Sequence, residues 1–188
     1  MIKTGNRFME LGSLARLLFL GLLILGGPLA WAQTGPNRIA FTDPQGRLAT
    51  VAADGSDLRV LSGLGQRFQF PAWSPDDGLL AAIAADAQGG AVYITPDAEN
   101  AELNELYRSR SETPFYLYWA PDSQSLGFLA NHPSGLGLHL ASVAEADSRL
   151  RLTGRPFYWQ WSADSRELLI HSGFSGPGSS LGFIDAAT

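Results

Sequence analysis

Residues 68–84 read FQFPAWSPDDGLLAAIA. At the centre of this stretch, Trp73-Ser74-Pro75-Asp76 could be an active-site loop with a serine beside a carboxylate, or a turn between two strands. Two later segments align with residues 71–84 without a gap, namely residues 117–130 (LYWAPDSQSLGFLA) and 159–172 (WQWSADSRELLIHS). The stretch is therefore one copy of an internal repeat, and such a repeat is the first feature to interpret in any sequence.

The repeat keeps a tryptophan and, three residues later, an aspartate. The tryptophans are spaced by 46 and 42 residues, and the serine and the proline that lie between the two residues are each replaced once. We interpret the tryptophans as packing anchors and the aspartates as turn formers. These structural repeat anchors are Trp73, Asp76, Trp119, Asp122, Trp161 and Asp164. A period in the low forties is typical of a four-stranded propeller blade.

Apolar and aromatic runs separated by turn residues predict four strands in each unit. In the unit that contains Trp119, the predicted strands are 115–119, 125–130, 138–143 and 149–152. In the preceding unit, 91–95 fits the third strand, and 102–107 fits either the fourth strand or a short helical turn. The runs 38–42, 48–52 and 58–61 fit the second, third and fourth strands of an earlier unit. The sequence thus predicts an all-β propeller of four-stranded antiparallel blades, with units at about 38–63, 68–110, 114–154 and 156–185.

This pattern resembles the TolB-like (WD40-like) β-propeller repeat family, whose signature is W-S-P-D-G followed by an apolar strand. The resemblance covers about residues 38–185. One copy has Asp76-Asp77-Gly78, with one residue more before the glycine than the family's D-G. The other two copies have Asp-Ser with Gln124 or Arg166 in place of the glycine, and the third has Ala163 in place of the proline. The family resemblance implies six or seven blades, and about four sectors are present. We therefore expect an incomplete ring, in which the chain is the N-terminal part of a longer propeller or a second chain supplies the remaining blades.

The first 32 residues have the order of a secretory signal peptide rather than of a blade. Lys3, Arg7 and Arg16 precede the apolar run 17–25, and Ala30-Trp31-Ala32 forms an A-x-A cleavage site. We expect a signal peptide helix over residues 1–32, cleavage after Ala32, and a propeller segment over residues 33–188. An uncleaved membrane anchor is the alternative, although the run is short for a span of about 20 apolar residues. The predicted location is periplasmic or extracellular.

Composition limits the possible partners of the exported segment. The chain has no cysteine, so it has neither a lipoprotein attachment site nor a disulfide. Its net charge of −5 becomes −7 once the leader, with three basic residues and one acidic residue, is removed. This acidic balance argues against a nucleic-acid partner and against a polybasic membrane surface.

The sequence offers no convincing catalytic or metal site, and we predict no catalytic residue, no cofactor and no bound metal. Ser74 is replaced by alanine in the next copy, and the nearest G-x-S-x-G match, residues 173–177, ends in proline. His132 and His139 lie in different predicted elements, and no H-x-x-x-H spacing is present. Asp76-Asp77 lacks the ligand spacing of a calcium loop. The glycine-rich segment 176–180 is predicted to be a flexible loop.

Aromatic residues before the tryptophans form a separate pattern. Alternation along 115–119 places Tyr116 and Tyr118 on one face of the strand and Trp119 on the other. The simpler interpretation is packing between blades, with the phenol hydroxyls reaching water or backbone. The alternative is an aromatic rim around the central channel that binds a peptide or a sugar. The residues of this possible ligand rim are Phe70, Tyr116, Tyr118 and Tyr158.

The resemblance and the lack of a catalytic constellation together predict a non-catalytic binding scaffold. Its partners would be proteins or cell-envelope polymers, with no nucleic acid and no membrane after signal cleavage. One alternative is the gating propeller of a serine peptidase whose hydrolase domain lies beyond Thr188. Another is a carbohydrate-binding propeller. The fold cannot decide between them, because propellers have many functions.

Overall fold

The structure is a computed structural model that describes residues 37–173 and 180–187, in which the chain forms fourteen strands. The signal peptide predicted over residues 1–32 lies outside this range, as does nearly all of the G-x-S-x-G-like segment and of the predicted loop 176–180. Within the described ranges, no helix is long and apolar enough to cross a bilayer.

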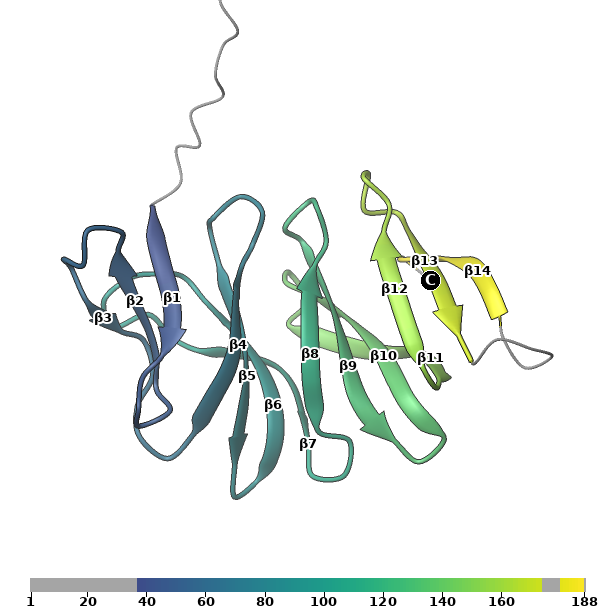
Figure 1. The fold of residues 1–188 in the computed structure, drawn as a ribbon, viewed down its shortest axis with the longest axis horizontal. Coiled ribbons are helices and arrows are strands. Elements are labelled where there is room, and N and C mark those ends of the chain that lie inside the picture. Colours follow the sequence, from purple (N-terminus) through teal and green to yellow (C-terminus); the bar gives the residue numbers. More distant parts are fainter. Residues whose placement is uncertain (1–36, 174–179, 188) are drawn as a thin grey trace, which may run out of the picture. The chain divides into compact units, whose positions relative to one another are not determined.

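The strands form four antiparallel sheets that follow one another in chain order (Figure 1). The first sheet contains β1 (Arg38–Thr42), β2 (Leu48–Ala52) and β3 (Arg59–Val60). The second contains β4 (Arg67–Trp73), β5 (Leu80–Asp86), β6 (Gly89–Thr95) and β7 (Asn104–Ser109). The third contains β8 (Pro114–Trp119), β9 (Ser125–His132), β10 (Gly135–Ser142) and β11 (Asp147–Gly154). The fourth contains β12 (Phe157–Trp161), β13 (Glu167–Ser172) and β14 (Ser180–Asp185). The fold class predicted from the repeat, an all-β propeller, is confirmed.

We call β4, β8 and β12 the leading strands, because each begins its sheet and forms one edge of it. Strand β8 lies beside β4, and β1 lies on the other side of β4 (Figure 1). A short connection leads from β3 to β4, as from β7 to β8 and from β11 to β12. Strands β1 to β3 therefore occupy the second to fourth positions of a blade, and no described residue supplies a leading strand for this sheet.

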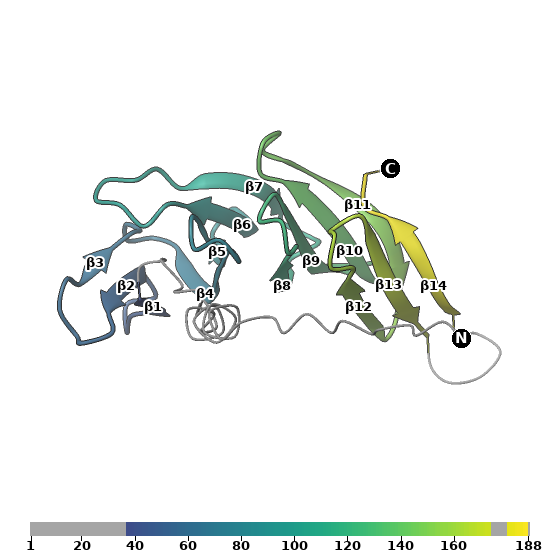
Figure 2. The same cartoon turned by 90° about the horizontal axis from the view of Figure 1, so that it is seen from above.

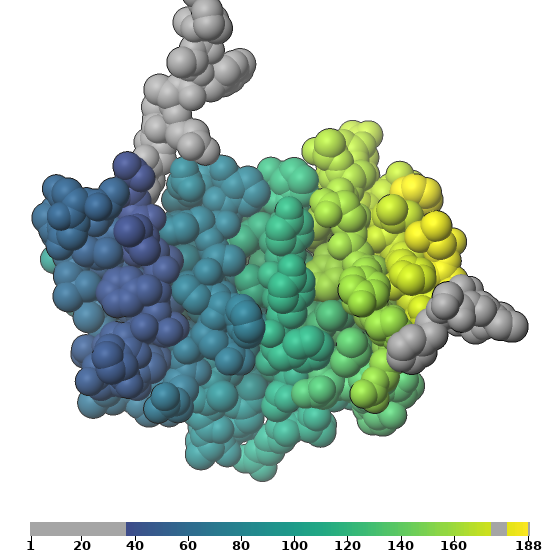
Figure 3. Space-filling view, viewed as in Figure 1, coloured from purple at the N-terminus to yellow at the C-terminus, as the bar shows by residue number. Residues whose placement is uncertain are grey.

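A hydrophobic cluster fills each space between neighbouring sheets, and the four sheets succeed one another when seen from above (Figure 2). Leu48 and Leu61 pack on the second sheet around Leu80 and Tyr93. The cluster between the second and third sheets includes Ile83, Val92, Trp119, Leu126 and Phe128. The cluster between the third and fourth sheets includes Leu129, Leu138, Phe157, Trp161 and Leu168. In the space-filling view, side chains close the spaces between successive ribbons (Figure 3). Apolar burial between sheets is therefore the main stabilising contribution.

Two local predictions needed correction. The helical alternative for residues 102–107 is wrong, because the chain there forms β7, which pairs with β6 and buries Leu106. The hairpin of β9 and β10 is longer than predicted, since pairing continues to His132 and Gly135. Gly135 has φ of 130°, which closes the turn at low cost because glycine has no side chain. The longer hairpin carries both His132 and His139.

Candidate functional site

The turn after each anchor tryptophan has the same backbone hydrogen bonds in all three copies. In the first copy, Ser74 N donates to Leu79 O at 2.8 Å and Asp77 N donates to Ser74 O at 2.9 Å. The corresponding bonds of Ala120 and Ser123 measure 2.9 and 3.1 Å, and those of Ser162 and Ser165 measure 2.9 and 3.0 Å. The Trp-Ser-Pro-Asp stretch is thus a repeated structural turn between a leading strand and the next strand.

The anchor aspartates hold this turn with their side chains. Asp76 Oδ1 accepts hydrogen bonds from Ser74 Oγ at 2.6 Å and from Gly78 N at 3.0 Å. These bonds favour the charged carboxylate, so they lower the pKa of Asp76 below its ordinary value. Ser74 is buried, and its Oγ also accepts from Leu79 N. The serine and carboxylate that suggested chemistry in the sequence therefore complete the turn.

The other two turns repeat this arrangement. Asp164 Oδ1 accepts from Ser162 Oγ at 2.7 Å and from Arg166 N at 3.2 Å, and these bonds lower the pKa of Asp164. Asp122 Oδ1 accepts from Gln124 N at 2.8 Å. Because Ala120 has no hydroxyl, this turn lacks the serine bond, and within its own sheet it is held by the backbone bonds and by the Asp122 carboxylate.

The residue after each anchor aspartate has a left-handed backbone, with φ of 58° at Asp77 and 61° at both Ser123 and Ser165. The repeat family has glycine here, which adopts this conformation without strain. The two serines are buried, and each bonds to the turn of the preceding sheet. Asp76 N donates to Ser123 Oγ at 3.1 Å, and Asp122 N donates to Ser165 Oγ at 3.0 Å. A hydrogen bond between sheets thus offsets the backbone strain.

The anchor tryptophans differ in burial. Trp119 and Trp161 are each 4% exposed, and Trp119 Nε1 donates to Ala72 O on the preceding leading strand at 2.9 Å. Trp73 is only half-buried, and its Nε1 has no hydrogen-bond partner within the described chain. The preceding sheet offers no described leading strand to cover Trp73, which explains its lower burial. Trp161 is buried, although its Nε1 also has no hydrogen-bond partner within the described chain.

A concave aromatic site lies across the leading strands. It has a volume of about 480 Å³. Its lining residues are Phe70, Phe115, Tyr116, Leu129, Phe157, Tyr158 and Trp159. We call this site the aromatic pocket. It brings together three of the four predicted rim residues, Phe70, Tyr116 and Tyr158, whereas Tyr118 does not line it.

The rim side chains of the aromatic pocket are solvent-exposed although they are large and apolar. Phe70 is 53% exposed, Tyr116 45% and Tyr158 62%. Tyr116 meets Trp159 edge-on, with 5.5 Å between ring centroids, and Tyr158 stacks on His171. Edge-to-face and stacked contacts fix ring orientation, so the pocket walls are preorganised.

Irregularities in the backbone of β4 and β8 shape this pocket. They explain why side-chain alternation along the sequence predicted only some of its lining residues. Phe70 has φ of 52° and lies in a bulge where the pairing of β4 with β5 shifts between Gln69 and Ala72. A similar shift occurs in β8 between Pro114 and Tyr116. A bulge redirects side chains, so Phe115 and Tyr116 both line the pocket although strict alternation would separate them. The sequence prediction missed Phe115, Leu129, Phe157 and Trp159, of which all but Leu129 lie in the aromatic runs 115–119 and 157–161.

A polar cluster lies elsewhere, beside the β9–β10 hairpin. Nε2 of His132 and Nε2 of His139 each lie 4.0 Å from a carboxylate oxygen of Glu112. His139 is buried, stacks on Phe128 and has no hydrogen-bond partner at Nε2 within the described chain. Burial lowers the pKa of His139, since it disfavours the charged ring. Across the described chain, no group of three histidines or carboxylates is arranged to hold a metal ion.

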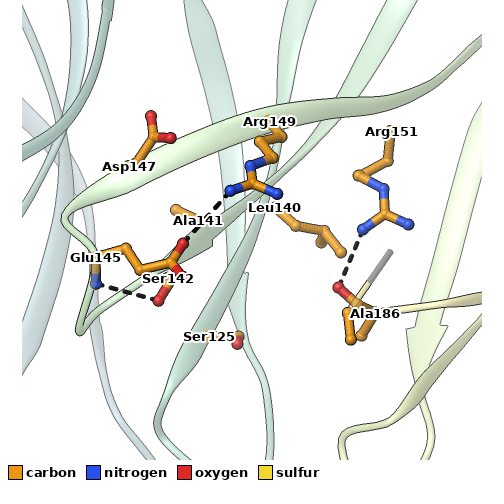
Figure 4. Close-up of a pocket in the computed structure, with 10 residues that line it drawn as sticks. Ser125, Leu140, Ala141, Ser142, Glu145, Asp147, Arg149, Arg151 and Ala186 are labelled. Atoms are coloured by element: carbon orange, nitrogen blue, oxygen red, sulfur yellow. Dashed lines mark hydrogen bonds and ion pairs between the residues drawn. The ribbon is translucent and has the colours of Figure 1, made fainter.

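A second, polar pocket of about 280 Å³ lies between the outer strands of the third sheet and Ala186 (Figure 4). Arg151 donates to the backbone oxygens of Asp185 and Ala186 at 2.8 and 3.0 Å. Arg149 pairs with Glu145 at 3.8 Å. These arginines bind groups of the chain itself, so the aromatic pocket is the stronger candidate for a ligand site.

No protein-family model and no curated sequence matches this chain. Solved structures do match it in fold. TolB from Acinetobacter baumannii matches with a TM-score of 0.56 and 16% identity, over 80% of this chain and 39% of that one. The tricorn protease matches with a TM-score of 0.60 and 13% identity, over 79% and 14%.

A third match is an oligogalacturonate lyase in complex with manganese, with a TM-score of 0.60 and 14% identity, over 81% of this chain and 46% of the lyase. The chain thus spans less than half the length of each of these proteins. The matches show that the fold is that of a TolB-like β-propeller. Since their names include a protease and a lyase, the shared fold carries no conclusion about catalysis.

Proposed function

We propose that this chain is a non-catalytic binding scaffold of the TolB-like propeller type, which binds a protein partner through the aromatic pocket. The observation that carries this proposal is the set of exposed aromatic side chains on neighbouring leading strands, Phe70, Tyr116 and Tyr158, around one concave site. Large aromatic side chains that converge on a concave site are typical of ligand sites and of interface hot spots.

The chemistry of the lining favours a peptide over a sugar. Among the described residues, no charged side chain and no amide side chain lines the pocket, and the side-chain hydroxyls in its lining are those of Tyr116 and Tyr158. Sugar hydroxyls that are buried without hydrogen-bond partners would cost binding free energy. Burial of one large apolar side chain contributes about 1.5–3 kcal/mol. An apolar segment of a protein therefore gains most from this site.

The cellular setting is part of the same proposal. A leader with basic residues, an apolar core and Ala30-Trp31-Ala32 supports export, with cleavage after Ala32. The partner would then be a periplasmic or extracellular protein, or a protein attached to an envelope polymer. Expression of the intact gene, followed by N-terminal sequencing of the exported product, tests this part, and a product that retains Met1 would contradict cleavage.

The binding part is tested with a double substitution, Tyr116→Ala with Tyr158→Ala. The probe is a pool of fluorescent hexapeptides with two central positions drawn from Leu, Phe, Trp and Pro, flanked by Gln. We expect binding to be lost while the melting temperature changes by less than about 3 °C, because the removed side chains are exposed. A large fall in the melting temperature would instead show that these tyrosines are packing residues.

The matched control is Tyr118→Ala. Tyr118 lies on the same strand as Tyr116 and is 47% exposed, against 45% for Tyr116, but it does not line the pocket. The proposal requires that this variant bind the pool as the unchanged chain does. Equal loss in the control and in the double variant would remove the pocket from the function.

A further inference from the structure

Four arginines of the described chain have no partner for their side chains. Six of the ten arginines in residues 37–187 form an ion pair or a hydrogen bond within the chain. Arg38, Arg47, Arg59, Arg108 and Arg149 form ion pairs, and Arg151 donates to backbone oxygens. The other four are exposed and make no side-chain hydrogen bond or ion pair within the described ranges, namely Arg67, Arg110, Arg155 and Arg166.

Three of these four arginines occupy equivalent places in successive sheets. Each lies where the chain enters a leading strand, against the glycine of a hairpin turn in the preceding sheet. A Cβ added to Gly46 would lie 3.3 Å from the Cα of Arg67, and one added to Gly89 would lie 2.9 Å from the Cα of Arg110. One added to Gly135 would lie 3.1 Å from the Cβ of Arg155. We call Arg67, Arg110 and Arg155 the entry arginines.

The entry arginines lie at the pocket end of the leading strands. β4 begins at Arg67, and its pocket residue Phe70 is three residues further on. Arg155 precedes β12 by two residues, and the first three residues of β12 line the pocket. The opposite ends of the same strands carry the anchor aspartates. The arginines therefore lie at one end of the leading strands and the anchor aspartates at the other, although the chain as a whole is acidic.

One acidic residue is close to the entry arginines along the chain. Glu112 follows Arg110 by two residues, and its carboxylate oxygens face His132 and His139 at 4.0 Å. Glu112 forms no ion pair with Arg110. Asp43 and Asp86, in the hairpins of Gly46 and Gly89, pair with other arginines. Within the described ranges the entry arginines therefore have no carboxylate partner.

We propose that the peptide bound by the aromatic pocket is acidic, with uncharged apolar side chains in the pocket and Asp or Glu residues on either side of them over the entry arginines. This inference rests on the proposed binding function and adds the charge of the partner. Guanidinium groups bind carboxylates through short, charge-assisted hydrogen bonds. A local positive surface on an acidic protein selects acidic segments and accelerates their association.

The experiment compares three peptide pools on the full chain by fluorescence anisotropy. All three share two central positions drawn from Leu, Phe, Trp and Pro, and these are flanked on each side by two Glu, two Gln or two Lys. We expect the Glu pool to bind at least about tenfold more tightly than the Gln pool at low salt. The ratio should fall below about threefold in ~0.5 M NaCl, because salt screens exposed charges.

Charge reversal supplies the decisive variant. Arg67→Glu, Arg110→Glu and Arg155→Glu together should invert the preference, so that the Lys pool binds more tightly than the Glu pool. Inversion cannot result from unfolding, since an unfolded chain would lose binding to every pool. The matched control is Arg149→Glu with Arg166→Glu, which reverses exposed arginines outside the entry positions and should leave the preference for Glu unchanged.

The remaining outcomes separate this inference from the proposed function. The Glu and Gln pools could bind equally tightly, and both could lose binding in the Tyr116→Ala, Tyr158→Ala variant. That result would overturn the acidic preference and support the aromatic pocket as the binding site. Binding of Glu-Glu-Ser-Ser-Glu-Glu as tightly as of the Glu pool would overturn both, because the pocket would then contribute nothing. Tighter binding of oligo-dT or heparin than of the Glu pool would overturn the peptide assignment. Failure of all three pools to bind would overturn both proposals.

Discussion

The two ends of the leading strands differ in what repeats and in what is exposed. At the end near Asp76, Asp122 and Asp164, the same backbone hydrogen bonds recur in three turns, and serines of one sheet bond to the turn of the previous sheet. At the other end, aromatic side chains project into solvent and the entry arginines have no partners in the described chain. Polar groups that bond one another maintain the architecture, whereas exposed and unpartnered groups are available to a ligand.

Positions that recur in every copy and positions that do not have different roles in this chain. A residue kept in every copy, such as the anchor tryptophan, serves a contact that every sheet boundary needs. Phe70 shares its repeat position with Tyr116 and Tyr158, three residues before the tryptophan, but of the three it alone has a left-handed backbone, with φ of 52°. Backbone strain at an exposed aromatic residue supports a functional interpretation, since strain persists where the surrounding structure requires it.

The largest effect is expected at the turn end. Trp119→Ala should lower the free energy of unfolding by about 3–5 kcal/mol, because it removes a buried indole and its hydrogen bond to Ala72. Trp73→Ala should cost clearly less, since Trp73 is half-buried and its Nε1 has no partner in the described chain. Urea denaturation of both variants measures the difference. A loss below about 1 kcal/mol for Trp119→Ala would refute its role as an anchor.

Substitution of the left-handed turn residues by glycine should change the free energy of unfolding by a smaller amount, with one variant less stable and the other more stable. Ser123→Gly relieves the backbone but removes the bond from Asp76 N, so we expect a destabilisation of about 1–2 kcal/mol. Asp77→Gly removes no hydrogen bond of the Asp77 side chain and relieves the same strain, so it should stabilise by up to about 1 kcal/mol. Both values come from equilibrium denaturation. Equal shifts in the two variants would show that the Ser123 hydroxyl contributes nothing.

A third prediction concerns pH and the buried His139. Its pKa is lowered by burial, so below the ordinary value of 6.5 the unfolded chain binds a proton that the folded chain resists. Stability should therefore fall as the pH drops below about 6.5 and level off below the folded pKa. His139→Phe, which keeps the stacking on Phe128, should show a shallower fall. Parallel stability curves of the two chains between pH 7.5 and 5 would contradict this.

The smallest effect on stability is expected at the pocket end. Tyr158→Ala should change the free energy of unfolding by less than about 0.5 kcal/mol, because the side chain is 62% exposed. The same variant should lose most of its affinity for the acidic peptide pool. Thermal unfolding and anisotropy on one preparation test both halves. A stability loss as large as that of Trp119→Ala would mean that the two ends do not differ in role.

Sequence reasoning predicted the strands best where local chemistry decides them. Strands β1 and β2 have the bounds predicted from their apolar runs, and the anchor aspartates form the predicted turns. The sequence of residues 102–107 was compatible with a strand or a helical turn because it is rich in polar residues. In the structure, pairing with β6 makes this segment a strand. His132 and His139 were assigned to different elements, a turn and the strand after it, and the long β9–β10 hairpin brings both to Glu112.

Local sequence was enough to predict the repeat, the all-β class and the turn after each tryptophan, because strand alternation and the aspartate and serine side chains act on the backbone within a few residues. The grouping of the aromatic side chains in one pocket and the equivalence of the entry arginines emerge only in the folded chain. Both features involve residues from separate sheets. They depend on two bulges and on the packing of hairpin glycines against the next sheet, and neither can be recognised from the local sequence. The Trp-Ser-Pro-Asp stretch belongs to the first group, as architecture. The aromatic pocket belongs to the second, because contacts between sheets create it.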